Sequence, residues 1–268
     1  MFRSVFLKTL YDQRRSILGW GLGLGALGLL TLLFYPSVKA AGAAYDEILR
    51  TMPREYLAFF GNVTSFTEIE GYIIASLLIY LPPVLAIYSI GAALSMITGE
   101  IEGGQMDILM AHPLPRWRIV LEKYAALATA VVAICLILGL CLGLGGLIIR
   151  SDIPHVSPER WLVAGLHVAP LTIFLGSVAF ALACVFRGRF LAIAAATTLS
   201  VGSFILNGLT PLVERLQALK KWNPYYWYAA GKPLSTGILP EGVALLLGLS
   251  LVFLGLGIAG FGRRDVLA

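Results

Sequence analysis

Charged side chains are scarce in this sequence. Only 13% of its 268 residues are Asp, Glu, Lys or Arg, whereas 58% are hydrophobic, and the mean hydropathy is +0.84. A soluble domain carries about 25% charged residues, so a chain with half that share cannot cover a globule with polar groups. The composition excludes a soluble enzyme, a nucleic-acid-binding domain and a disordered protein, and it predicts an integral membrane protein.

Motifs for metal, disulfide or nucleotide chemistry are also lacking. The three cysteines, Cys135, Cys141 and Cys184, lie in apolar runs without disulfide or zinc spacing. No G-x-x-x-x-G-K-[ST] motif is present, and the G-x-G-x-x-G matches at 23–28 and 255–260 lie inside apolar runs, where helix packing is their expected role. We therefore expect no catalytic residue, metal site or cofactor site on this chain.

Six stretches contain no Asp, Glu, Lys or Arg at all. They are 18 to 28 residues long, and a bilayer core about 30 Å thick needs about 20 helical residues. The sequence thus predicts an all-α membrane protein in which residues 1–268 form a single transmembrane domain, with Pro82-Pro83 kinking the second span. The predicted spans are residues 16–35, 71–98, 124–149, 161–186, 190–209 and 243–260.

The distribution of charge predicts the orientation of the chain. Six spans place both termini on one side, and the segments on that side hold eleven basic and six acidic residues, against nine of each on the other side. The positive-inside rule then places both termini in the cytoplasm. Residues 1–15 alternate apolar and basic positions at helical spacing, which predicts an amphipathic helix on the inner lipid surface. The apolar run that follows is too long for a cleaved signal peptide, so we expect a retained anchor.

Two features of the outer half are candidates for a pathway or gate. Residues 222–228 hold five aromatic residues, among them Trp222, Tyr225 and Trp227, which are typical either of an interfacial belt or of a re-entrant segment that closes the outer mouth. His167 is the only titratable side chain of the His, Asp, Glu, Lys and Arg types within the six predicted spans. It is either a functional intramembrane group or a neutral imidazole bonded to a neighbouring helix.

The segment 99–123, between the second and third predicted spans, is the most informative one. It begins with acids and glycines, continues into a short apolar helix expected near residues 105–111, and ends with prolines and bases. A short helix held between two turns can transmit force from a docked protein, whereas an ordinary connector would not need this order of residues. The residues concerned are Glu100, Glu102, Gly103, Gly104, Asp107, Ile108, Leu109, Pro113, Arg116 and Lys123.

This loop closely resembles that of the type-2 ABC transporter permease family. The family pattern of glutamates, glycine, Leu-rich helix, proline, arginine and lysine is matched, and the six spans with a long outer segment before the last one resemble half-length bacterial permeases. One departure is Gln105-Met106, where family members often carry a Thr-Leu pair.

The resemblance implies a transport subunit in a bacterial plasma membrane. Two such chains, identical or paralogous, would pair with two copies of a separate ATPase subunit that binds ATP and Mg. Segment 99–123 would act as the cytoplasmic coupling loop, and ATP-driven closure would switch the permeases between inward-facing and outward-facing states. An amphipathic, drug-like or lipid-like cargo is expected for spans so poor in charge.

Three other functions are compatible with parts of the sequence. An ion-coupled secondary transporter would normally bury an acid or unwind a helix at the midplane, and only Pro82-Pro83 offers such a feature. An intramembrane enzyme would need a catalytic constellation that the sequence does not contain. A non-transporting membrane scaffold with the same fold is a further alternative.

Overall fold

The computed structural model describes residues 4–53, 57, 66–111, 113–186 and 188–263. Within these residues the regular structure is helical, apart from one isolated β-bridge between Lys232 and Gly237. The α-helices are α1 (Val5–Ala40), α2 (Gly42–Thr51), α4 (Ile69–Ile73), α5 (Leu81–Leu94), α6 (Glu100–Glu102), α7 (Gln105–Met110), α8 (Arg116–Ile148), α9 (Pro158–His167), α10 (Ala169–Val185), α11 (Arg189–Leu209), α12 (Pro224–Ala229) and α13 (Pro240–Gly262). Two π-helical segments, η1 (Ile74–Leu78) and η2 (Ser95–Gly99), and one 3-10 helix, η3 (Glu214–Trp222), complete them.

Six helical stretches are long and apolar enough to cross a membrane, which confirms the predicted architecture. They are Val5–Ala40, Ile69–Glu102, Arg116–Ile148, Pro158–Val185, Arg189–Leu209 and Pro240–Gly262. Each begins before the corresponding predicted span, because polar residues extend the helix, and together they cover the predicted spans except for Ile149 and Phe186, which directly follow the third and fourth stretches. Residues 5–15 of the predicted interfacial helix and the first predicted span both belong to α1, while residues 1–3 lie outside the described residues.

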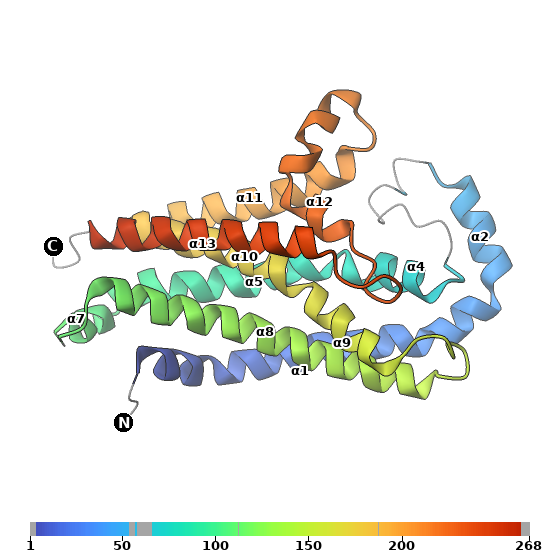
Figure 1. Cartoon of the computed structure of the whole chain (residues 1–268), viewed down its shortest axis with the longest axis horizontal. Coiled ribbons are helices and arrows are strands. Elements are labelled where there is room, and N and C mark those ends of the chain that lie inside the picture. Colours follow the sequence, from blue (N-terminus) through green and yellow to red (C-terminus); the bar gives the residue numbers. More distant parts are fainter. Residues whose placement is uncertain (1–3, 54–56, 58–65, 112, 187, 264–268) are drawn as a thin grey trace.

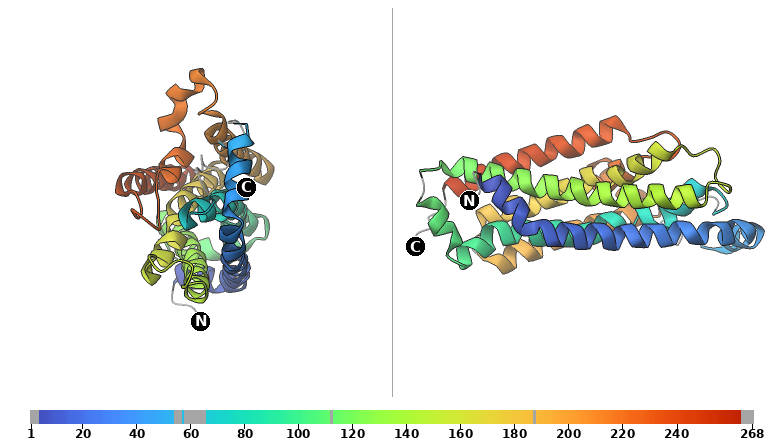
Figure 2. Two further views of the ribbon diagram at one scale, coloured as in Figure 1. Left: turned by 90° about the vertical axis from the view of Figure 1, so that its right-hand side faces the viewer. Right: turned by 90° about the horizontal axis from the view of Figure 1, so that it is seen from below.

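The helices form one elongated bundle (Figure 1). The start of α1, the end of α13 and the short helix α7 lie together at one end, which we call the α7 end, and α2 and the α8–α9 connection lie at the opposite, α2 end. Figure 2 shows η3 projecting sideways from the bundle near the start of α12. An even number of crossings therefore brings both ends of the described chain to the α7 end.

Helix α1 packs closely along α8, and glycines permit the approach. A Cβ atom built on Gly25 would lie 2.5 Å from Sγ of Cys141, and one on Gly28 would lie 2.9 Å from Cδ2 of Leu142. Gly260, in the second G-x-G-x-x-G match, approaches Val185 of α10 in the same way. These glycines thus pack helices, as the sequence predicts.

Prolines interrupt two of the six spans. The second span changes from π-helix to α-helix through a turn at residues 79–80, directly before Pro82-Pro83. The fourth span breaks at Val168, between α9 and α10, because Pro170 has no N–H to continue the backbone ladder. His167 is the last residue of α9, so the second interruption places its side chain at a break in the helix.

Candidate functional site

At the α7 end, glycines and prolines isolate α7 from the helices on either side. Gly104 has φ of +69°, a left-handed conformation that other residues rarely adopt, and it forms the N-cap of α7. Extended backbone at Pro115 then precedes α8, which begins at Arg116. The predicted short helix near 105–111 is therefore confirmed as Gln105–Met110, while Gly99–Glu102 and Arg116–Lys123 belong to the adjoining helices.

Helix α7 turns one apolar side to the bundle and another to the surroundings. Met106 is fully buried, and Leu109 is half-buried against the same core of apolar side chains. Ile108 is 68% exposed, and Asp107 and Pro113 are also exposed. Of the two apolar contacts predicted for a partner, only Ile108 is thus presented outward.

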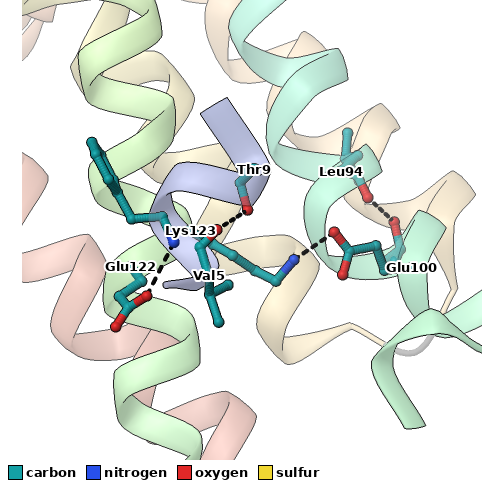
Figure 3. Close-up of polar contacts among 8 residues, drawn as sticks. Val5, Thr9, Leu94, Glu100, Glu122 and Lys123 are labelled. Atoms are coloured by element: carbon teal, nitrogen blue, oxygen red, sulfur yellow. Dashed lines mark hydrogen bonds and ion pairs between the residues drawn. The ribbon is translucent and has the colours of Figure 1, made fainter. Parts of the chain in front are cut away.

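Lys123 and Glu100 form an ion pair inside the chain, as Figure 3 shows. Nζ of Lys123 donates to Oε1 of Glu100 at 2.5 Å, and the side chain of Lys123 is 1% exposed while that of Glu100 is 18% exposed. The structure therefore directs Lys123 inward, and not toward a docked protein as predicted. The pair ties the start of the third span to α6, next to the glycine turn that carries α7.

Two further predicted residues make looser contacts at this end. Glu102 lies 3.7 Å from Nη1 of Arg189, and both side chains are about half exposed. Nη1 of Arg116 donates to the carbonyl of Gly262 at 3.4 Å, which links the start of α8 to the end of α13. Glu102, which precedes α7, thus contacts the fifth span, and Arg116, which follows α7, contacts the sixth span.

Glu122, which was not predicted as a site residue, fixes the start of α1. Its Oε2 accepts the backbone N–H of Phe6 at 3.0 Å (Figure 3), and its Oε1 accepts Nε of Arg118 at 2.8 Å. The first turn of a helix has N–H groups without intrahelical partners, so a carboxylate there is favourable. This contact joins residues 116 positions apart and has no local sequence signal.

Away from the α7 end, the structure separates the three aromatic residues predicted to form a gate. Trp222 is 86% exposed, and Trp227 is half-buried with its Nε1 donating to the carbonyl of Lys221 at 2.8 Å. Only Tyr225 points into the bundle, where it is 2% exposed. Burial raises the pKa of Tyr225 to about 12, so its hydroxyl keeps its proton at neutral pH.

Asn223 holds the short helix α12 against the bundle. Its Oδ1 caps the helix by accepting the N–H of Tyr225 at 3.0 Å, and its Nδ2 donates to the carbonyl of Ser203 on α11 at 2.8 Å. Asn at the N-cap followed by Pro at the first helical position is a recognisable start signal, so Asn223-Pro224 could have been predicted.

His167 contacts Tyr228, which was not among the predicted site residues. The two rings stack with centroids 4.5 Å apart and planes inclined by 21°. Oη of Tyr228 donates to the carbonyl of Leu78 at 2.7 Å. That carbonyl needs an outside donor because the residues four and five positions later are Pro82 and Pro83, which have no N–H. The proline pair thus creates the acceptor that anchors Tyr228.

These side chains border a cavity of about 130 Å³. Apolar residues of the second span line it, together with His167, Asn207 of α11 and the segment that runs from Tyr225 to Pro233. Nδ1 of His167 and Oη of Tyr225 are both buried without a hydrogen-bond partner in the described part of the chain. The same part contains no group of three or more His, Cys, Asp or Glu side chains that could hold a metal ion.

Comparison with known families gives a match over most of the chain. The model of the family described as "Multidrug efflux system permease Rv1217c, C-terminal domain" matches residues 9–262, a range that includes most or all of each of the six spans. A search of curated proteins finds no match.

Proposed function

We propose that this chain, which belongs to the multidrug efflux system permease Rv1217c C-terminal domain family, is the membrane-spanning subunit of an ATP-driven exporter. Membership makes it a transport permease, and its six apolar helical stretches make it a multi-pass membrane protein. The proposal adds the energy source, a separate ATPase subunit that docks at the α7 end. It also adds the cargo class, an amphipathic, drug-like or lipid-like molecule.

The observation that carries this proposal is the form of α7. An exposed apolar side chain, Ile108, lies on a short helix that is bounded by a glycine turn and a proline-containing turn. Docking energy concentrates in apolar side chains that become buried, with surrounding charges mainly steering the approach. Force applied to α7 would reach the third span through the ion pair between Lys123 and Glu100.

The proposed complex contains two permease chains and two ATPase subunits in a bacterial plasma membrane, with both permease termini in the cytoplasm. A surface for the second permease chain, whether a copy or a paralogue, is available on α11. Of its spanning residues only Ala192, Ala196, Ser200 and Gly208 are buried, whereas large side chains such as Phe190 and Val201 are exposed. In this complex ATP and Mg bind to the ATPase and not to this chain.

A pair of variants on α7 tests the docking. Ile108→Asp puts a carboxylate on the exposed side of the helix, so we expect a folded permease that no longer co-purifies with the ATPase, because a charge in a closed contact costs several kcal/mol. Leu109→Asp should instead destabilise the permease itself, since Leu109 packs against its own core. The measurements are co-purification with a tagged permease, the mass of the complex, and ATP hydrolysis in lipid.

Gln105→Asp is the matched control, because it adds the same charge at an exposed polar position of the same helix. It should leave the complex intact. A full-strength, transport-coupled complex with Ile108→Asp would contradict docking at α7. Transport that survives ATP depletion and collapses with an ion gradient would instead identify a secondary transporter.

Single cysteines test the orientation of the permease. In a background without Cys135, Cys141 and Cys184, we expect an impermeant thiol reagent applied to intact cells to label Ser235→Cys and to spare Ala111→Cys. Both positions are exposed, and Ala111 follows α7 while Ser235 lies between α12 and α13. Labelling of Ala111→Cys alone would place α7 outside the cell and remove it from any cytoplasmic ATPase.

A further inference from the structure

The cavity beside His167 combines an apolar wall with a fixed aromatic wall. Ile74, Leu78 and Ile79 of the second span supply the apolar side, and the stacked rings of His167 and Tyr228 supply the aromatic side. Its volume of about 130 Å³ suits a single six-membered ring, since an apolar cavity of about 150 Å³ accommodates benzene. The one charged side chain that lines it, Lys232, is exposed.

The imidazole of His167 is held in one orientation by its neighbours. One face stacks on Tyr228, and a Cβ atom built on Gly231 would lie 2.5 Å from Cε1 of His167, so only glycine leaves room for the ring there. The hydroxyl of Tyr228 is committed to the carbonyl of Leu78 and cannot turn to the imidazole without leaving that carbonyl unpaired.

The side chain of His167 thus lines the cavity and keeps one hydrogen-bonding atom unused. His167 is 5% exposed, and its Nδ1 has no hydrogen-bond partner in the described part of the chain. Buried polar side-chain atoms are paired in the large majority of cases, and the exceptions call for an explanation. A second such atom, Oη of Tyr225, belongs to another residue lining the same cavity.

We propose that this cavity binds a small hydroxylated aromatic molecule, with its ring against the apolar wall and its hydroxyl on Nδ1 of His167. A phenolic hydroxyl both donates and accepts, so it satisfies Nδ1 in either imidazole tautomer. A purely apolar ring would leave the nitrogen unpaired, and an anion would enter a space without a buried positive charge. The identification of this ligand as cargo depends on the proposed function, whereas binding itself does not.

Binding can be measured on the permease alone, without ATPase or ATP, so that its failure is distinct from a failure of ATP coupling. The purified chain in lipid nanodiscs is titrated with 4-fluorophenol and followed by fluorine NMR. We expect a saturable signal that empty nanodiscs do not give and that unlabelled phenol displaces. Fluorobenzene, which has the ring without the hydroxyl, should bind about tenfold more weakly, as expected for the loss of one buried hydrogen bond.

Two variants and a control connect the signal to the cavity. His167→Phe keeps a ring beside Tyr228. It should lower the affinity for 4-fluorophenol about tenfold and leave the affinity for fluorobenzene unchanged. Gly231→Ala displaces the imidazole and should lower the affinity for 4-fluorophenol. The control is Trp222→Ala, at a position 86% exposed, which should leave the affinity for both probes unchanged.

The proposal is overturned if the wild-type chain gives no saturable signal, the result expected when only water occupies the site. It is equally overturned if 4-fluorophenol and fluorobenzene bind with equal affinity. This second comparison uses the unmodified protein, so it decides the matter even if His167→Phe does not fold.

Discussion

Two buried titratable side chains, Lys123 near the α7 end and His167 at the break between α9 and α10, are accommodated in opposite ways. Lys123 is 1% exposed and pairs with Glu100, so its charge is neutralised by a neighbour on another helix. His167 is 5% exposed, stacks on an aromatic ring, and has an unpaired Nδ1 within the described residues. The first arrangement is closed and ties helices together, whereas the second leaves an atom available to a ligand. Burial alone therefore does not distinguish a structural group from a functional one. The distinction is whether the buried polar atom already has a partner within the protein.

The largest expected effect on stability is at the α7 end, where Lys123 pairs with Glu100. Glu100→Ala leaves the ammonium of Lys123 buried without its partner, and we expect a loss of about 3 kcal/mol in the free energy of unfolding, measured by titration with SDS. Lys123→Met should cost less, because Glu100 is 18% exposed and can be hydrated. Glu102→Ala is the control, since its contact with Arg189 is exposed and worth no more than about 1 kcal/mol. Equal effects of Glu100→Ala and Glu102→Ala would show that the buried pair does not hold this end together.

A smaller effect is expected where Tyr228 supports His167. Tyr228→Phe preserves the stacked ring but leaves the carbonyl of Leu78 without a donor, which should cost about 1–2 kcal/mol in the same unfolding measurement. Tyr225→Phe removes a buried hydroxyl that has no hydrogen-bond partner in the described region, so it should have little effect. An unchanged stability for Tyr228→Phe would mean that the proline pair needs no outside donor.

The smallest effect is expected for His167 itself. Because Nδ1 bonds to nothing within the described chain and phenylalanine can replace the stacked ring, His167→Phe should change the free energy of unfolding by less than about 1 kcal/mol. A structural histidine would cost about 1–3 kcal/mol, because its removal leaves a neighbour unpaired. A loss as large as that for Tyr228→Phe would therefore place His167 with Lys123, as a group that supports the fold.

The short helix α7 shows which properties local sequence can predict and which it cannot. Its limits follow from Gly104 and Pro113, and the structure agrees with them closely. The direction of its side chains does not follow, because Met106, Ile108 and Leu109 are all apolar and a helix of six residues is too short for periodicity to select one face. The bundle selects it by burying Met106 and leaving Ile108 exposed.

The loop 99–123 and the cavity beside His167 also differ in how far local sequence predicts them. The loop 99–123 is continuous in the sequence, so its order of acids, glycines and prolines could be interpreted directly. The cavity joins the second, fourth and fifth spans to the segment after η3, and its central contact, Tyr228 with Leu78, connects residues 150 positions apart. Aromatic content alone led to the prediction that Trp222, Tyr225 and Trp227 share one role. In the structure, the short helix α12 turns only Tyr225 and Tyr228 inward.

The sequence by itself determined the class of protein, the six spans and the position of the short helix α7, because the absence of charge over about 20 residues and the presence of glycine and proline act locally. Tertiary structure alone decided that Lys123 faces Glu100, that Glu122 holds the start of α1, and that His167 lies on Tyr228 beside a cavity. The physical reason is that a buried polar group takes whichever partner the packing of distant helices brings within about 3 Å, and no local pattern of residues specifies that partner.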